Sequence, residues 1–167
     1  MKFERAWAMP NKYTFQIKPI EFWIVRHIPA TGGIVIVDPF CGESVIADVR
    51  NDMRISGEDS LDWLKRIPSD SADILLFDPP YSPRQKKECY DDVGVHLSDT
   101  TSGYWAKLKD EIARIVKHGG IVMSFGWNSN GIGKSRGFQF KGDGLIVAHG
   151  GNHNDTICVC EEKQRTL

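Results

Sequence analysis

Short apolar runs alternate with amphipathic segments along the chain. The runs are rich in β-branched residues, which is typical of strands buried on both faces. They cover residues 34–37, 74–77, 121–125, 145–148 and 157–159. Helical spacing of apolar residues predicts helices over residues 18–28, 60–66 and 104–117, and Gly119 and Gly120 are expected to end the last of them. This alternation predicts an α/β fold with a mostly parallel sheet.

The length and the absence of linkers predict one domain. The chain has 167 residues, with no internal repeat, low-complexity tract or Pro/Gly-rich linker, so residues 1–167 are expected to fold together. It carries 21 basic and 22 acidic side chains, a formal charge of −1. This balance excludes a highly basic protein that coats nucleic acid, and it is compatible with a local basic groove.

Composition also sets expectations about compartment and metal. No apolar run approaches the roughly 18 residues that cross a bilayer, and residues 1–11 lack the core of a signal peptide. We therefore expect a cytoplasmic protein without a membrane partner. The cysteines at positions 41, 89, 158 and 160 match no zinc spacing, so we expect reduced thiols and no metal site.

Two of the predicted strands end in an aspartate followed by proline. In parallel α/β sheets, ligands bind at the carboxyl ends of strands. One loop reads Asp38-Pro39-Phe40-Cys41-Gly42-Glu43-Ser44, and the other reads Asp78-Pro79-Pro80-Tyr81. A third acidic loop contains Asp59 and Ser60, either of which can also cap the helix that follows.

The loop from Asp78 to Tyr81 suits a planar group that bears an NH2. Two consecutive prolines fix the backbone and leave their carbonyls as acceptors. The carboxylate of Asp78 and a carbonyl can each accept one N–H, while Tyr81 stacks on the ring. The alternative interpretation is an ordinary turn with Tyr81 covering the core.

With these loops in this order, the chain resembles the amino-methyltransferases that use S-adenosylmethionine. The resemblance covers nearly the whole chain, and it is closest to adenine-N6 DNA methyltransferases, in particular small phage-type members. The residues Asp78 to Tyr81 match the DPPY catalytic motif, which is highly specific for this superfamily. The resemblance implies a single-domain Rossmann-like class I fold with an antiparallel C-terminal strand.

The resemblance also implies the residues that hold the cofactor. The segment 15–19, with Lys18 and Pro19, is similar to the segment that packs over the methionine end. The loop from Asp38 to Ser44 is similar to the DPFxGxG loop and assigns cofactor contacts to Asp38, Pro39, Phe40 and Gly42. Asp52 and Asp59 correspond to the acids at the ribose and the adenine, and Asp78 adjoins the cofactor. All of these residues are therefore expected to bind S-adenosylmethionine.

The sequence departs from the family pattern near the first loop. Ser44 stands where the common pattern has glycine. The apolar residues 45–49 follow the first strand too closely for an ordinary parallel crossover, which needs a dozen or more residues. We expect either a shortened first helix or a helix formed by residues 45–49 themselves.

The implied catalytic residues are Asp78, Pro79, Pro80 and Tyr81. Hydrogen bonds from the amine to Asp78 and to the Pro79 carbonyl would localise the nitrogen lone pair, and Tyr81 would hold a flipped base. DNA is the expected partner, and the residues expected to contact it are Arg84, Lys86, Lys87 and Trp127. A solvated charged loop is the other interpretation of the three basic positions.

Three functions remain open from the sequence. The first is an adenine-N6 DNA methyltransferase. The second is a methyltransferase for another amine: RNA adenine or guanine, cytosine-N4, or a protein glutamine. Asp78 favours adenine, because Ser-Pro-Pro-Tyr is typical of cytosine-N4 enzymes and Asn-Pro-Pro-Tyr of glutamine enzymes. The third is a non-catalytic binding subunit. No separate target-recognition region fits in the chain, so we expect loose or short-site specificity, or help from a homodimer or a partner subunit.

Overall fold

The apolar runs form the centre of one sheet in the computed structural model, which describes residues 2–30, 32–80 and 103–165. The strands are β1 Phe3–Trp7, β2 Ile36–Asp38, β3 Val49–Arg50, β4 Ala72–Phe77, β5 Val116–Gly126, β6 Phe138–Phe140, β7 Gly144–Ala148 and β8 Thr156–Lys163. The α-helices are α1 Lys18–His27, α2 Met53–Ser56, α3 Ser60–Arg66 and α5 Gly103–Ile115. Two 3-10 turns, η1 Thr14–Gln16 and η2 Lys134–Arg136, complete the elements of this part of the chain.

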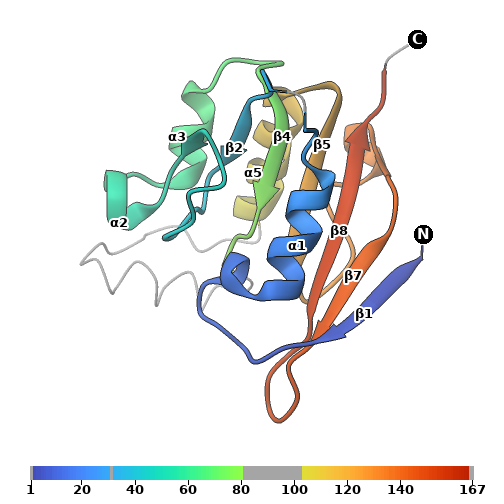
Figure 1. Cartoon of the computed structure of the whole chain (residues 1–167). Coiled ribbons are helices and arrows are strands. Elements are labelled where there is room, and N and C mark those ends of the chain that lie inside the picture. The colour runs from blue at the N-terminus through green and yellow to red at the C-terminus, as the bar shows by residue number, and fades with distance from the viewer. Residues whose placement is uncertain (1, 31, 81–102, 166–167) are drawn as a thin grey trace.

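The strands are ordered β1-β7-β8-β5-β4-β2-β3, and β6 also pairs with β8 (Figure 1). The pairs β1–β7, β2–β3, β2–β4 and β4–β5 are parallel. Strand β8 is antiparallel to β5, β6 and β7. The prediction of a single-domain α/β fold with a mostly parallel sheet and an antiparallel C-terminal strand is confirmed.

Helices cover both faces of this sheet. Helix α1 packs Ile20, Trp23 and Ile24 against one face, together with Ile74 and Leu76 of β4. Helices α3 and α5 cover the other face, where Leu75 and Phe77 of β4 join their core. Successive β4 side chains therefore enter opposite cores, which explains the continuous apolar run.

The region between β2 and β3 differs from what we expected. Residues 45–48 form no helix, and Val49 begins strand β3 instead. Both alternatives, a shortened helix and a helix over residues 45–49, are therefore wrong. A side-chain hydrogen bond holds this connection without a helix. Asp48 Oδ2 accepts from the Ile36 amide at 2.9 Å and so fixes the connection against β2.

The end of the last predicted helix is also corrected. Helix α5 ends at Ile115, and Val116 already begins β5. Gly119 and Gly120 lie within that strand, beside an irregularity in its pairing with β4. Gly120 has no room for a Cβ, because Lys117 and Asp73 backbone oxygens lie about 3 Å from its position. Gly120 therefore accommodates a close strand approach, and Gly119, with φ of +82°, adopts a left-handed conformation within the strand.

Candidate functional site

The two Asp-Pro loops lie side by side at the carboxyl edge of the sheet. Strands β2 and β4 are parallel neighbours, with Val37 opposite Leu75. Asp38 is the last residue of β2, and Asp78 directly follows β4. The Trp105 indole of α5 donates a hydrogen bond of 3.2 Å to the Pro80 carbonyl, which ties the second loop to that helix.

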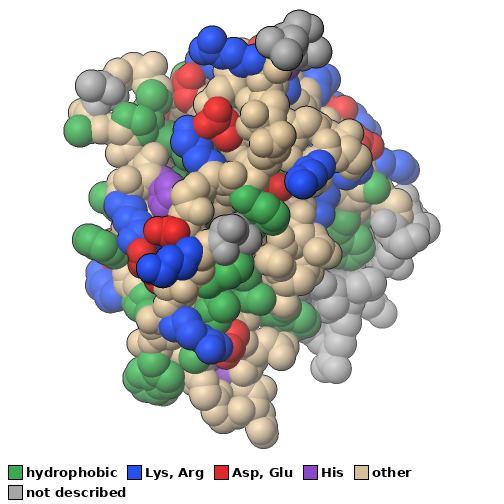
Figure 2. Space-filling model, turned by 90° about the vertical axis from the view of Figure 1, so that its right-hand side faces the viewer, with side chains coloured by type: hydrophobic (Ala, Val, Ile, Leu, Met, Phe, Trp, Pro, Cys, Tyr) green, Lys and Arg blue, Asp and Glu red, His purple; other side chains and the backbone are tan. Residues whose placement is uncertain are grey.

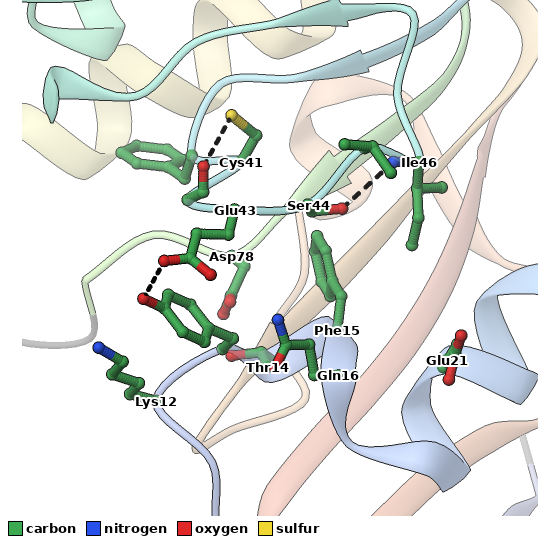
Figure 3. A pocket seen from close by; sticks show the side chains of 14 residues that line it. Lys12, Thr14, Phe15, Gln16, Glu21, Cys41, Glu43, Ser44, Ile46 and Asp78 are labelled. Atoms are coloured by element: carbon green, nitrogen blue, oxygen red, sulfur yellow. Dashed lines mark hydrogen bonds between the residues drawn. The ribbon is translucent and has the colours of Figure 1, made fainter. Parts of the chain in front are cut away.

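Two adjoining cavities open beside Asp78. Their volumes are about 250 and 300 Å³, and we refer to them together as the double cavity. Both are lined by Lys12, Tyr13, Phe40, Gly42 and Asp78. The first is also lined by residues including Phe15, Glu21 and Glu43, the second by residues including Asp52, Met53 and Pro80. In the close view, Asp78, Glu43 and Phe15 surround the same space (Figure 3).

The loop after β2 is shaped by two carboxylates. Asp38 Oδ1 accepts a hydrogen bond of 2.9 Å from the Phe40 amide, which turns the chain at the strand end. The Gly42 amide donates to Asp52 Oδ2 at 3.2 Å. Gly42 has φ of +52°, a left-handed conformation that favours glycine. This geometry presents Phe40 and Gly42 to the double cavity.

Asp38 itself is fully buried and does not line the double cavity. Burial raises the pKa of its carboxyl group to about 8, and the charges of Asp78 and Asp52 add to the increase. The Phe40 amide opposes the shift by hydrogen bonding to the charged form. Oδ2 has no hydrogen-bond partner among the described residues. Asp38 therefore shapes the loop through its hydrogen bond to the Phe40 amide and not by lining the double cavity.

The other two acids have different surroundings. Asp52 caps α2 by accepting from the Arg54 amide at 2.9 Å, and it lines the second cavity. A carboxylate has about four lone-pair sites, so Asp52 keeps acceptor capacity toward the cavity. Asp59 caps α3 by accepting from the Leu61 amide at 2.8 Å, and its other oxygen accepts from the Tyr104 hydroxyl at 2.9 Å. Asp59 is not among the lining residues.

An N-terminal segment closes the double cavity on the side opposite the loops. The Tyr13 hydroxyl donates a hydrogen bond to Glu43, and the Lys12 ammonium lies 4.6 Å from the centre of the Tyr13 ring. Phe15 packs edge-on against Phe125 of β5, with ring centres 4.8 Å apart. The segment thus bridges from the sheet core to the loop after β2.

The structure therefore brings together part of the predicted cofactor set. Phe40, Gly42, Asp52 and Asp78 line the double cavity. Five other predicted residues lie outside its lining: Lys18, Pro19, Asp38, Pro39 and Asp59. Lys18 is exposed and pairs with Glu21 at 2.6 Å, and Pro19 occupies the first turn of α1. The Pro39 carbonyl accepts from the Ser60 hydroxyl at 2.7 Å, which joins the loop to α3.

Sequence reasoning missed Lys12, Tyr13 and Glu43. The resemblance pointed to the segment 15–19, and the lining residues begin three positions earlier. No local signal distinguishes Tyr13, because its place depends on how the N-terminal segment crosses the sheet edge. Four of the predicted residues, Tyr81, Arg84, Lys86 and Lys87, lie outside the described residues.

A third, smaller cavity flanks the same loop. It has a volume of about 130 Å³, and because Trp105 and Trp127 line it, we call it the tryptophan cavity. Its other lining residues are Phe77, Pro79, Lys109, Ser124, Phe125, Gly126, Asn128 and Gly131. Asp78 lines the double cavity and Pro79 the tryptophan cavity, so consecutive residues, about 3.8 Å apart between Cα atoms, face different cavities.

The turn between β7 and β8, which contains His149 and His153, is held by hydrogen bonds. His149 is buried, and its Nδ1 lies 2.9 Å from the Ala8 carbonyl. Because a carbonyl can only accept, Nδ1 donates to Ala8, and Nε2 lies 2.9 Å from the Thr156 hydroxyl. In residues 2–30, 32–80 and 103–165, no three His, Cys, Asp or Glu side chains lie together as a metal site would require. None of the helices in these ranges is long and apolar enough to cross a membrane.

Comparison with known proteins identifies the fold. No family model and no curated protein sequence matches the chain. Among solved structures, the chain is similar to TrmN from Thermus thermophilus, with a TM-score of 0.54 and 16% sequence identity. The match covers 88% of this chain and 49% of that one, so the chain spans about half the length of TrmN. The chain therefore has a Rossmann-like α/β fold similar to that of TrmN.

The charge of the double cavity indicates which kind of ligand fits it. The described lining of its first part includes three carboxylates, Glu21, Glu43 and Asp78, against one ammonium, Lys12. The combined space is of the size that encloses a small-molecule ligand. An excess of carboxylates in a partly enclosed space favours a ligand that carries positive charge.

Proposed function

We propose that the protein transfers a methyl group from S-adenosylmethionine to the exocyclic amino nitrogen of a nucleic-acid base, with adenine N6 in DNA as the first candidate. One observation carries the proposal. Asp78 lies at the carboxyl end of β4 within the sequence Asp-Pro-Pro-Tyr, and cavities open on both sides of this loop. A transfer between two ligands needs such a boundary, with one ligand on each side.

The residues of the double cavity fit the cofactor. Asp52 offers acceptor capacity for sugar hydroxyls, and Phe40 offers an apolar surface. The carboxylates of Glu43 and Asp78 suit a cationic sulfonium. S-adenosylmethionine, when bound, supplies an electrophilic methyl group on that sulfonium. In the family pattern, the acid at the position of Asp59 contacts the adenine of the cofactor. Asp59 also has a structural role, because it accepts hydrogen bonds from the Leu61 amide and the Tyr104 hydroxyl.

On the acceptor side, Asp78 and the prolines provide orientation. The amino group of a base donates to the Asp78 carboxylate and to the Pro79 carbonyl, and these two acceptors favour a pyramidal nitrogen whose lone pair points toward the double cavity. Positioning of this kind accounts for much of the acceleration in a displacement reaction. Acceptors that are already in place stabilise the positive charge that grows on the nitrogen. The Trp105 hydrogen bond to Pro80 holds the loop in this geometry.

RNA adenine is the second candidate. The fold is similar to that of TrmN, an RNA methyltransferase, and the acid at position 78 favours adenine without distinguishing DNA from RNA. Incubation with labelled cofactor and a panel of duplex DNA, single-stranded DNA and RNA separates the candidates. Nucleoside analysis of the product names the methylated atom. Label in DNA adenine supports the first candidate, label only in RNA replaces it with the second, and label only in protein contradicts both.

The catalytic role of Asp78 has a direct test. Asp78→Asn keeps the shape and removes the charge, so we expect methyl transfer to fall at least about 100-fold. Cofactor affinity, measured by calorimetry, should change much less, because Glu43 and Asp52 remain. Asp62→Asn is the matched control, since Asp62 is exposed and pairs only with Lys65 among the ion pairs of the described residues. An Asp78→Asn protein with wild-type activity would refute the mechanism.

A further inference from the structure

The tryptophan cavity holds a buried polar group without a protein partner. Ser124 is 8% exposed, its side chain lines this cavity, and its hydroxyl makes no hydrogen bond to any described residue. Its backbone is held on both sides, opposite Phe77 of β4 and Val159 of β8. Buried hydroxyl groups are almost always hydrogen-bonded. A rigid, orphaned hydroxyl at a cavity wall therefore points to a ligand that supplies the missing partner.

The walls around Ser124 suit a planar aromatic ring. Trp105 and Trp127 line the cavity, and Phe77, Phe125 and Pro79 complete the apolar lining. The orientation of Trp105 is set by its hydrogen bond to Pro80. A volume of about 130 Å³ lies below the roughly 300 Å³ at which pockets enclose whole drug-sized ligands. The cavity therefore admits one ring system and leaves the rest of the ligand outside.

The charge of the lining indicates what lies outside. Lys109 of α5 is half-buried at this cavity, and no carboxylate belongs to the described lining. This is the opposite of the double cavity, where carboxylates predominate. Burial and the nearby Arg136 lower the pKa of the Lys109 ammonium, and the negative charge of Glu161 opposes this shift. A ligand anion beside Lys109 would likewise favour its charged form. An aromatic ring joined to an anionic group is the chemical description of a nucleotide.

We propose that the tryptophan cavity receives the acceptor base of a nucleotide, and that the Ser124 hydroxyl determines specificity by hydrogen bonding to a polar atom on the ring edge. Pro79 belongs to the same lining, which places the base beside the acceptors of the Asp78–Pro80 loop. This inference rests on the proposed function, because it names the acceptor site of that reaction. The largely aromatic lining favours a planar nucleobase over an aliphatic protein side chain.

The first test measures binding and needs no turnover. Adenosine 5′-monophosphate is titrated into the full-length protein, and binding is followed by calorimetry and by quenching of indole fluorescence. Trp127→Ala should weaken binding at least about fivefold, the lower end of what base stacking contributes. Ser124→Ala should weaken it about twofold to tenfold, the range for one hydrogen bond. Trp127→Phe keeps an aromatic face and should retain most of the affinity.

The matched controls lie away from the cavities. Trp7→Ala removes a largely exposed tryptophan of β1, and Ser71→Ala removes a hydroxyl that donates to the Pro68 carbonyl; neither residue lines the double cavity or the tryptophan cavity. Both variants should bind the nucleotide as the wild type does. Cofactor affinity should also be unchanged in Ser124→Ala, which separates loss of the acceptor site from loss of the fold. Undetectable binding by the wild type, or wild-type affinity in Ser124→Ala or in Trp127→Ala, would overturn the proposal.

Turnover then distinguishes this inference from the proposed function. If the protein methylates a nucleic acid, Ser124→Ala should raise the KM for that acceptor and leave the KM for S-adenosylmethionine unchanged. If neither Ser124→Ala nor Trp127→Ala changes methylation, the proposed acceptor site is wrong and the proposed function is unaffected. Nucleotide binding that depends on Ser124, in a protein that methylates no substrate in the panel, supports the site and contradicts the proposed function.

Discussion

The carboxyl group of Asp38 lies at the end of β2 under the loop that shapes the double cavity. Burial raises its pKa from 3.8 to about 8 in the folded protein. Between these values the folded protein keeps a proton that the unfolded chain releases. The stabilisation that Asp38 contributes to the folded state is therefore complete below about pH 4 and is lost as the pH rises through 8. Ionisation of Asp38 weakens the loop under neutral to basic conditions.

Asp38→Asn should remove this pH dependence. The amide oxygen can still accept from the Phe40 amide, and the side chain cannot ionise. From pH 5 to pH 9 we expect the wild type to lose about 4 kcal/mol relative to the variant, since the interval from pH 5 to the raised pKa spans about three units and each corresponds to about 1.4 kcal/mol. Urea denaturation at several pH values measures the difference. Parallel stability curves for the two proteins would contradict a raised pKa at this position.

A second residue-scale prediction concerns the glycine loop before η2. Gly131 has φ of +54°, and a Cβ at this position would overlap the carboxylate of Glu161. Glu161 is buried and accepts hydrogen bonds from the amides of Ile132 at 2.5 Å and Gly133 at 3.1 Å. Gly131→Ala therefore displaces a buried acceptor and should cost about 3 kcal/mol of stability.

Gly137→Ala is the matched control for that substitution. Gly137 also has a positive φ, of +82°, in the left-handed region, and nothing lies within 4 Å of its Cβ position. It should cost only the backbone strain, about 1 kcal/mol. Thermal or urea denaturation of both variants provides the comparison. Equal losses would show that the overlap with Glu161 has no influence.

At the scale of the elements, local pattern predicts the centre of the fold and misses its edges. Strands β4, β5 and β8 read directly as apolar runs, because both faces of a central strand are covered. Strand β1 has the sequence FERAW, with side chains that are half-buried or exposed, and its pairing with β7 joins residues more than a hundred positions apart. Such a strand is specified by its partner rather than by its own sequence.

The same contrast holds for the site. Asp78, Phe40 and Gly42 were predictable, because motif residues that follow a strand must lie at the carboxyl edge. Lys12 and Tyr13 were not, because their position depends on β1 and on the contact between Ala8 and the β7 end. The Ala8 amide donates to the Ala148 carbonyl at 3.1 Å, and the Ala8 carbonyl accepts from His149. These long-range hydrogen bonds direct the N-terminal segment across the double cavity.

Strand β1 should therefore influence ligand affinity from a distance. Gly144 of β7 has no space for a side chain, because the Phe3 ring of β1 occupies the position of its Cβ. Gly144→Val should displace Phe3, raise amide hydrogen exchange over β1 and weaken S-adenosylmethionine binding several-fold. Gly32→Val, at an exposed position with nothing within 4 Å, is the control. A loosened β1 with unchanged cofactor affinity would show that the N-terminal segment does not depend on this strand.

At the scale of the molecule, the chain has a formal charge of −1, although the proposed substrate is a polyanion. On the face beside the β1 edge, Lys and Arg side chains lie among acidic ones (Figure 2). Several of the described cations are engaged: Arg136 pairs with Asp110, Arg114 with Glu111 and Lys117 with Asp73. Nonspecific attraction to nucleic acid should therefore be weak, and affinity should depend on a few local contacts.

The basic positions Arg84, Lys86 and Lys87 give this argument its test. If each contacts a phosphate, replacing all three with Gln lowers the slope of log K against log salt concentration by about 3 for duplex DNA. Binding of adenosine 5′-monophosphate, which needs only the tryptophan cavity, should be unchanged. Lys65→Gln with Lys141→Gln is the control, because both residues form exposed ion pairs that contribute little. An unaltered salt slope would assign phosphate contacts to other residues, and the first to substitute would then be Lys109, the cation of the tryptophan cavity.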